Sequence, residues 1–579
     1  MIHIKDHKQL DLFDPWRFLS PKRRQLLDKT WPGLFQAQIL PNLPVSSLYP
    51  FFEKDFGRPT KELHTVLGAL IFQQMFDLTD GEACDQLTFN IQWHYALNIT
   101  EESDSAKYIC PKTLWNMRSI LIDNRLDDLL FGSVTKQLAD TFKVNTDNQR
   151  IDSVHIKSNM RRLGRIGIFA SGIHKFLTNL KRQHTDLFDT INTTLIERYL
   201  PEKSMQCFSM VKPSDAHKTL SMVSTDLFDL VTRFKDRPAV CDMHSYKQLE
   251  RILEDQCNVQ SSEDGLSVTV KTPKEIPSDS LQNPSDPDAT YSGHKGQGYQ
   301  VQIMETYIPT TDKETRETTL NLITHVEVEP AHKSDANALL PAIASVQKRD
   351  FAPKEILADS LYGGDDNCLQ AQQRHVEIVA PTMGQKNENV ACLSDFVLSE
   401  TGDVVTCPQG LAPVAVKKKK TRYTAVFDSS HCSGCPDQAY CPAKAGKKHY
   451  FLHYTEKEMR IAERRVYEQT DEFKDRYRWR SGIEATMSEY DRRTGVKQLR
   501  VRGFKSVKFC AVLKAIGINL FRAAAVWMAI NPDPNDDKSS GFRRNHTFLI
   551  IKEHFLRKWL GLKNFFMAVT PNNKHMLKT

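Results

Sequence analysis

The stretch Ile151-Asp152-Ser153-Val154-His155-Ile156 separates helical from strand-like patterns along the chain. Its alternation predicts a short strand that carries Asp152, Val154 and Ile156 on one face. Before it, residues 1–140 show apolar residues at helical spacing and predict a helical N-terminal domain. After it, we expect a mixed α/β core.

Three further strand-like runs support that core: 298–303, 320–328 and 355–359. Residues 336–348 between the last two have a helical pattern, and strand–helix–strand spacing predicts a partly parallel sheet covered by helices. Residues 165–257 return to helical patterns and predict a helical insertion within the core.

Two helical patterns close the core. One long helix is expected over 456–493, and a second over 509–530. The apolar run of the second is interrupted by Lys514, Asn519 and Arg522, which favours a buried helix over a membrane span.

Charge is unevenly distributed over the 579 residues. Lys and Arg number 78 against 71 Asp and Glu, which gives a formal net charge of +7. Residues 538–578 alone hold nine Lys/Arg and one acid, which suggests polyanion binding or a solvated tail. The N-terminus lacks the apolar segment of a secretory signal, and 12 cysteines are too sparse for a disulfide scaffold. We therefore expect reduced thiols and a cytoplasmic protein.

Three acids have settings suited to metal-dependent chemistry on phosphodiesters, in which carboxylates hold divalent ions. Asp152 lies in the first strand, and Asp359 ends a later one, where open α/β sheets bind ligands. Glu484 shares a helix face with Tyr477 and Arg480, and that face could hold a metal and a DNA phosphate. Each acid also has an ordinary alternative: a solvent-facing strand residue, a cap of the following turn, or an i,i+4 ion pair on a solvated helix.

The segments around these acids resemble the signatures of bacterial insertion-sequence DDE transposases. The resemblance rests on Arg150-Ile151-Asp152-Ser153, Ala358-Asp359-Ser360-Leu361-Tyr362-Gly363 and Tyr477-Arg478-Trp479-Arg480-Ser481-Gly482-Ile483-Glu484. The last is similar to the Tyr–Arg–Glu part of the Y-R-E-K motif of that family. Residues 291–299 and 57–97 also look like the strand entry and the N-terminal helical domain of the family, in the family's order.

The resemblance implies an RNase H-like catalytic core in which Asp152, Asp359 and Glu484 bind two Mg²⁺ or Mn²⁺ ions. It implies hydrolysis at the ends of the element, followed by attack of the freed 3′-hydroxyl on target DNA. It also implies that Tyr477 and Arg480 contact DNA phosphate. Synapsis of two DNA ends implies a dimer or a higher assembly.

One position departs from the family pattern. Asp491 stands where the family has a lysine, seven residues after the glutamate, and it cannot supply the positive charge. We hypothesise that the adjacent Arg492 contacts DNA in its place. Three basic residues that follow this helix are further candidates for phosphate contacts: Arg500, Arg502 and Lys505.

Four cysteines gather in residues 384–452: Cys407, Cys432, Cys435 and Cys441. Four thiolates can bind one structural Zn²⁺ and fold a segment that lacks a large core. The spacing is irregular, so four unlinked reduced cysteines remain the alternative, and His431 and His449 are replacement ligands. Similar cysteine-bearing insertions in some relatives of the family favour zinc.

The expected organisation is therefore that of an α/β protein with two interruptions of its core. In chain order, we expect a helical DNA-end-binding domain over 1–140, a first part of the core over 145–383 with a helical insertion at about 160–280, a cysteine-rich insertion over 384–452, the rest of the core over 453–530, and a basic tail over 531–579.

The leading hypothesis is a metal-dependent transposase in the bacterial cytoplasm, near the nucleoid. Its partners would be double-stranded DNA, both terminal repeats and target, and we expect no membrane association. One alternative is a DNA-binding repressor that has lost catalysis, which Asp491 favours and the three acids oppose. Another is a nuclease with the same core and no strand transfer.

Overall fold

The computed structural model describes residues 1–9, 13–201, 211–262, 265–384 and 390–531. The predicted basic tail therefore lies outside the described residues, apart from its first position. The chain divides into two compact units, Met1–Trp527 and Met528–Thr579. The elements below belong to the first unit, apart from the last three residues of helix α22.

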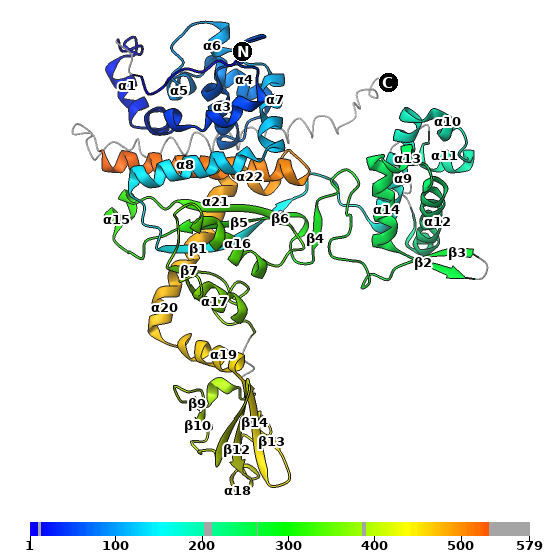
Figure 1. Cartoon of the computed structure of the whole chain (residues 1–579), viewed down its shortest axis with the longest axis vertical. Helices are drawn as coiled ribbons and strands as arrows, with labels where there is room; N and C mark the ends of the chain where they lie inside the picture. Colours follow the sequence, from blue (N-terminus) through cyan, green and yellow to red (C-terminus); the bar gives the residue numbers. More distant parts are fainter. Residues whose placement is uncertain (10–12, 202–210, 263–264, 385–389, 532–579) are drawn as a thin grey trace, which may run out of the picture. The chain divides into compact units, whose positions relative to one another are not determined.

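A six-stranded mixed sheet forms the centre of the first unit (Figure 1). Its order is β4-β5-β1-β7-β8, and β6 pairs with β5. The strands are β1 Asn148–Lys157, β4 Thr290–Ser292, β5 Gly296–Thr306, β6 Ile323–Pro330, β7 Glu355–Leu357 and β8 Glu377–Val379. Strand β5 is antiparallel to β1, β4 and β6, whereas β1, β7 and β8 are parallel. This arrangement is the RNase H-like core that the sequence predicts.

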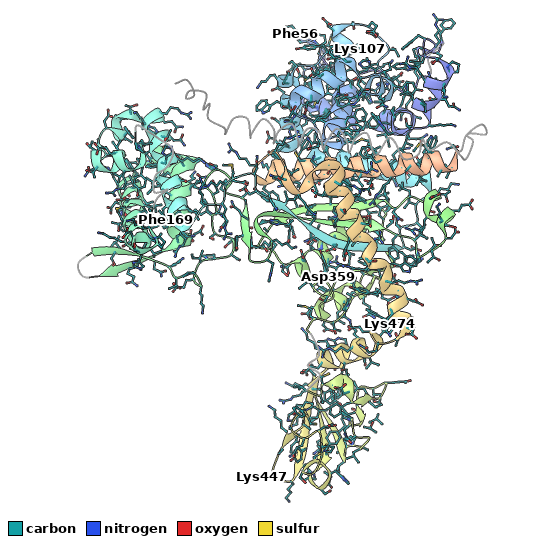
Figure 2. The ribbon with its side chains drawn as sticks, turned by 180° about the vertical axis from the view of Figure 1, so that it is seen from behind. Phe56, Lys107, Phe169, Asp359, Lys447 and Lys474 are labelled. Carbon is teal, nitrogen blue, oxygen red and sulfur yellow. The ribbon has the colours of Figure 1, made fainter. Side chains whose placement is uncertain are left out.

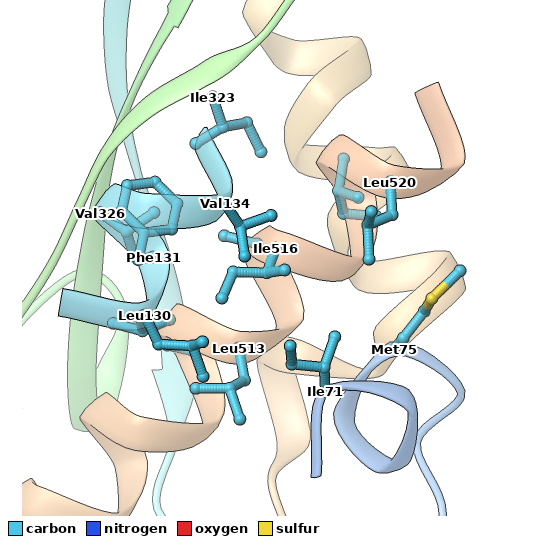
Figure 3. Close-up of a cluster of buried hydrophobic side chains, with 14 of the residues drawn as sticks. Ile71, Met75, Leu130, Phe131, Val134, Ile323, Val326, Leu513, Ile516 and Leu520 are labelled. Atoms are coloured by element: carbon cyan, nitrogen blue, oxygen red, sulfur yellow. The ribbon is translucent and has the colours of Figure 1, made fainter. Parts of the chain in front are cut away.

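Helix α22, Phe504–Ile530, packs in the core between the sheet and N-terminal helices. Figure 3 shows Ile516 and Leu520 of this helix among side chains from β6, from α8 (Leu126–Phe142) and from α3 (Leu63–Met75). A Cβ atom added at Gly517 would lie 2.9 Å from the Cα of Met75, so this glycine permits the close approach of α3. The N-terminal helices and the sheet therefore share one hydrophobic core.

The length and composition of α22 would suit a membrane span, but 83% of its most apolar window is buried in the fold. Its polar residues have partners inside the protein. Lys514 donates to Asp77 at 2.9 Å. The side chain of Asn519 exchanges hydrogen bonds of 2.8 and 2.9 Å with the backbone of Ile323. Buried polar groups are stable only when they are paired, and these contacts pair them. The prediction of a buried helix is confirmed.

Proline residues and capping side chains mark the starts of several N-terminal helices. Pro21 opens α1, Thr79 caps α4 with a reciprocal bond to Glu82, and Pro111 opens α7. Helix α3 begins at Leu63, where the Glu62 side chain accepts from the first backbone amides of the helix and acts as its cap. The bounds of these helices are α1 Pro21–Asp28, α4 Asp80–Phe89 and α7 Pro111–Asp123. Further helices in this region are α2 Trp31–Leu34, α5 Ile91–Ala96 and α6 Asp104–Lys107.

A helical segment with its own hydrophobic core follows β1. Its helices are α9 Arg165–Gln183, α10 Thr185–Phe188, α11 Thr193–Tyr199, α12 Ala216–Phe234, α13 Pro238–Cys241 and α14 His244–Gln256. Phe169 of α9, labelled in Figure 2, belongs to that core. The segment ends in a hairpin of β2 (Cys257–Ser262) and β3 (Gly265–Val270), which the sequence analysis does not predict.

The cysteine-rich segment also forms sheets of its own. A four-stranded antiparallel sheet has the order β11-β12-β14-β13, and β9 pairs with β10. The elements are β9 Val397–Leu398, β10 Val404–Thr406, β11 Ala415–Lys419, β12 Arg422–Asp428, α18 Ser429–Cys432, β13 Lys444–Ala445 and β14 His449–Thr455. A small core that includes Tyr423, Leu452 and Tyr454 holds them together.

The predicted continuous helix over 456–493 is wrong. The structure has α19 (Glu456–Tyr467), α20 (Asp471–Tyr477), a 3₁₀ turn (Arg478–Ser481) and α21 (Gly482–Thr494). Thr470 accepts a hydrogen bond from the amide of Phe473, so its hydroxyl caps a new helix where the pattern suggests continuity. The remaining helices of the core are α15 Lys313–Thr318, α16 Leu339–Gln347 and α17 Asp365–Gln372.

Candidate active site

Strand pairing brings Asp152 and Asp359 to the same level of the sheet. Arg150 of β1 pairs in parallel with Leu357 of β7, and each acid lies two residues beyond its paired residue. Asp359 follows the end of β7, and its charge acts on the pKa of Asp152, so the two carboxyl groups are neighbours. Asp359 is labelled in Figure 2. The structure therefore brings together two acids that lie far apart in the sequence.

Arg480 connects the first of these acids to Glu484. Its Nη2 atom donates to Oδ2 of Asp152 at 2.8 Å, and its Nη1 atom donates to Oε1 of Glu484 at 2.7 Å. The Asp152 side chain is 16% exposed, whereas that of Glu484 is 66% exposed at the start of α21. One guanidinium thus holds a buried and an exposed carboxylate of the predicted triad.

The site holds an excess of negative charge. Burial raises the pKa of Asp152 above its usual value, and the charges of Asp359 and Asp335 raise it further, although Arg480 acts in the opposite direction. Burial also raises the pKa of Tyr477, and Asp359 and Asp152 contribute to that rise. Mutually repelling carboxylates with oxygen donors are what a hard divalent cation such as Mg²⁺ neutralises. The donor set therefore fits the metal that the sequence predicts.

Asp359 also has the structural role that the sequence left open. Its Oδ1 atom accepts from the backbone amide of Leu361 at 2.9 Å and so closes the turn that follows β7. A carboxylate has two oxygens, and this bond fixes the side chain through one of them. Asp359 can therefore close the turn with one oxygen and still contribute its other oxygen to the acidic cluster.

A fourth acid that the sequence does not predict, Asp335, lies in the turn between β6 and α16. Asp335 is 8% exposed. Its carboxylate accepts a hydrogen bond from the Gln302 side chain at 2.8 Å and lies 3.6 Å from Nζ of Lys295. Asp335 acts on the pKa of Asp152, so it belongs to the same electrostatic site. A Ser-Asp pair shortly after a predicted strand was the available signal, and it has no distinctive spacing.

A buried ionic network holds the start of α21 against the sheet. Glu305 of β5 is fully buried and accepts from Arg150, Arg522 and Thr486 at 2.7 to 2.8 Å. Arg150 also donates to the carbonyl of Trp479 at 2.6 Å, in the turn just before α21. Glu484 lies in the first turn of that helix, so this network positions it.

The six predicted DNA contacts fall into two groups. Tyr477 and Arg480 lie at the acidic site: Tyr477 is half-buried and stacks on Phe473 with ring centroids 5.3 Å apart, and Arg480 bonds the acids. The other four are exposed, on α21, in the segment that leads into α22, or in the first turn of α22: Arg492, Arg500, Arg502 and Lys505.

Two of these cations differ in how they are held. Arg500 donates to the backbone carbonyl and to the carboxylate of Asp77 at 3.0 and 3.2 Å. Arg492 has no ion pair within the part of the chain that the structure describes. Asp491 occupies the position where the family has a lysine, and its carboxylate lies 3.8 Å from Nζ of Lys497. A second cation therefore lies close to this face of α21.

The structure brings the four cysteines to one cavity. Cys407, Cys432, Cys435 and Cys441 all line it, as does His431, and none forms a disulfide. Burial raises the pKa of Cys432 and of Cys441, and negative charge on the neighbouring cysteines raises it further. No three of the sulfur atoms lie within 4.8 Å of one another among the described residues. A zinc ion would relieve the repulsion between thiolates and would draw the sulfurs closer.

Two families of known proteins match parts of the chain. The Transposase DDE domain matches residues 406–524, and the Transposase domain (DUF772) matches residues 27–119. The first range includes the four cysteines, Arg480 and Glu484, whereas Asp152 and Asp359 precede it. No curated protein matches the sequence.

Proposed function

Because the chain belongs to the insertion-sequence DDE transposases, we propose that it cuts DNA at the ends of its element and joins the freed ends to target DNA. The observation that carries the proposal is that Arg480 joins Asp152 of the central strand β1 to Glu484 by two hydrogen bonds, while Asp359, after the neighbouring strand β7, acts on the pKa of Asp152. The carboxylates belong to separate strands and a helix, and a solvated surface gives no reason to gather them.

We propose that Asp152, Asp359 and Glu484 hold two divalent ions, Mg²⁺ or Mn²⁺. When bound, such ions activate the attacking oxygen and stabilise the leaving oxygen of a phosphodiester. Asp152 offers a position on strand β1, Asp359 is fixed by its bond in the turn after β7, and Glu484 offers an exposed carboxylate that can adjust. Arg480 can then transfer its hydrogen bonds from the acids to a DNA phosphate, since guanidinium binds both groups.

The proposed reaction has two displacements at phosphorus. In the first, a water oxygen bonds to the phosphorus at the end of the element, the bond to the 3′-oxygen breaks, and that oxygen leaves as a 3′-hydroxyl. In the second, this hydroxyl loses its proton and bonds to a phosphorus of target DNA, whose own 3′-oxygen leaves. No covalent link to the protein forms in either step.

DNA is the proposed partner on both sides of the reaction. The helical N-terminal region would recognise the terminal repeats, and Arg492, Arg500, Arg502 and Lys505 would contact phosphates near the cut. Two ends must meet before strand transfer, so we propose that the active form is at least a dimer, in the cytoplasm beside the nucleoid.

The test is cleavage of a DNA duplex that carries the element's own end, with and without Mg²⁺. Wild type is compared with Glu484→Gln, which keeps the size of the side chain and removes its charge. Glu463→Gln on the exposed face of α19 is the matched control. We expect cleavage by wild type and by the control, and loss of cleavage but not of DNA binding in Glu484→Gln.

Adding a labelled target duplex separates the proposed function from its alternatives. Joined products that depend on Glu484 support strand transfer. Cleavage without joining would indicate a nuclease. Specific binding of the ends without any cleavage by wild type would indicate a repressor that has lost catalysis.

A further inference from the structure

The N-terminal segment lies along the residues that lead into α3. The amide of Thr60 donates to the carbonyl of Met1 at 2.9 Å, and the amide of Leu63 donates to the carbonyl of His3 at 3.2 Å. This pairing carries His7 to the start of α3, where Glu62 and His64 lie. Two histidines and a glutamate from separate segments therefore meet at one point.

The ligand atoms of this group lie close enough to share one metal ion. One ring nitrogen of each histidine and one carboxylate oxygen of Glu62 all lie within 4.8 Å of one another. The Oε1 atom of Glu62 is 2.9 Å from Nδ1 of His64 and 3.9 Å from Nε2 of His7. Ligand atoms around a tetrahedral zinc ion are separated by about 3.3 Å, and the two distances fall on either side of that value.

The buried ring of His7 gives independent evidence that a binding partner is absent at this point. Its side chain is only 2% exposed, and its ring centroid is 4.7 Å from that of His64. Neither of its ring nitrogens has a hydrogen-bond partner within the described residues. Buried polar atoms are nearly always paired, so an unpaired imidazole at a His–Glu pair indicates an absent partner.

The carboxylate of Glu62 is fixed in an orientation suited to metal binding. Its carboxylate accepts from the backbone amides of Lys5, His64 and Thr65 at 2.7 to 3.3 Å. Bonds of this kind keep a carboxylate ionised and fix its orientation, as outer-shell donors do around metal ligands. Nitrogen and carboxylate ligands together suit zinc, and three protein ligands leave one position for water.

We propose that His7, Glu62 and His64 form a Zn²⁺ site that fastens the N-terminal segment to the start of α3. The site is separate from the acidic cluster and from the four cysteines. It stabilises the helical region that precedes the sheet, and it takes no part in cleavage. The test below measures bound zinc and not DNA cleavage. A negative result would therefore overturn the zinc site without bearing on the proposed transposase reaction.

The test is zinc content per chain in the full-length protein without a histidine tag. Because the cysteines are a second candidate site, the measurement uses a Cys432→Ser/Cys435→Ser background. In that background we expect one zinc ion per chain. We expect His7→Gln to lose it and His3→Gln, an exposed histidine on the same segment, to keep it. No zinc in the background protein, or equal zinc in the two histidine variants, would overturn the proposal.

Cobalt substitution gives a second readout that does not depend on how well His7→Gln folds. The Cys432→Ser/Cys435→Ser protein is loaded with Co²⁺ and its visible spectrum is recorded. We expect ligand-field bands of a four-coordinate ion without the thiolate charge-transfer bands that cysteine ligands produce. Bound cobalt with thiolate bands, or no bound cobalt, would contradict a site made of histidine and glutamate.

Discussion

The guanidinium of Arg480 donates a hydrogen bond of 2.8 Å to the carboxylate of Asp152, which lies 328 residues earlier in the chain. A charged, largely buried carboxylate is costly unless a cation faces it, so Arg480 stabilises the acidic site in the protein without metal. Under the proposed function, a divalent ion would take the Asp152 carboxylate and a DNA phosphate would take the guanidinium. The contact would then couple metal binding to DNA binding.

Asp152→Asn is expected to stabilise the metal-free protein at neutral pH. Burial raises the pKa of Asp152, so its charged form is disfavoured in the folded chain relative to the unfolded one. This cost is present above the folded pKa and disappears as the pH falls through it, because the folded protein then takes up the proton. In thermal melts without metal, the variant should melt above wild type at pH 7 and approach wild type as the pH is lowered.

The control for this prediction is Asp312→Asn, at the exposed cap of α15. There a hydrogen bond from Thr315 lowers the pKa of Asp312, and asparagine keeps the cap. No stabilisation is expected at any pH. A gain of equal size in both variants would show that the Asp152 effect reflects charge removal in general.

Glu305→Gln is expected to cost about 3–5 kcal/mol, because it leaves Arg150 and Arg522 buried beside a neutral amide. The same change at Glu317, in a surface pair with Lys313, should cost less than about 1 kcal/mol. Urea denaturation at pH 7 measures both.

The pH dependence of this contribution gives a second check. Burial alone would raise the pKa of Glu305, but Arg522 and Arg150 hold it below its usual value. The stabilisation is therefore full above the unfolded carboxyl pKa and is lost as the pH falls through the folded one. A gap between wild type and variant that stays constant in acid would contradict this assignment.

Local patterns in the sequence predict the parts of this site that depend on neighbours in the chain. Strand alternation places Asp152, and the apolar run before Asp359 ends in the polar turn that the structure contains. The break before α20 has a local signal, a Thr470 cap followed by Asp471 and Glu472, but the 3₁₀ turn over 478–481 contains no glycine or proline that would mark it.

The contacts missed by sequence analysis come from long-range pairing. Asp335 reaches Asp152 only after β5 and β6 have paired, and Glu305 meets Arg150 across the sheet. His7 meets Glu62 through a segment that forms no regular strand. None of these acids or histidines follows a spacing rule, so their roles follow from three-dimensional contacts.

Gly482→Ala is expected to weaken cleavage although glycine carries no functional group. A Cβ atom here would lie 2.0 Å from Nη1 of Arg150, so the guanidinium must leave the carbonyl of Trp479 or α21 must shift. Such overpacking costs about 1–3 kcal/mol and displaces Glu484 in the first turn. Gly81→Ala in α4 is the control, since nothing lies within 4 Å of its added atom. Normal cleavage by Gly482→Ala would show that the start of α21 tolerates movement.

Cys432→Ser is expected to remove the proposed zinc ion from the cavity of the four cysteines and to loosen the sheet β11-β12-β14-β13. That segment has only a small core, so metal binding should contribute much of its folding free energy. Zinc analysis and limited proteolysis are the measurements. Cys392→Ser is the control, because Cys392 lies in the same segment but outside the cavity. Equal protease resistance in the two variants would contradict a structural zinc ion.

Arg492→Ala is expected to weaken DNA binding evenly across sequences. The side chain is exposed on α21 without an ion pair among the described residues, so its loss should remove one phosphate contact and little stability. One fewer contact lowers the slope of log affinity against log salt by about 0.9. Lys313→Ala, which removes an exposed charge from α15, controls for net charge. If the two variants give the same slope as wild type, Arg492 does not replace the lysine for which Asp491 stands.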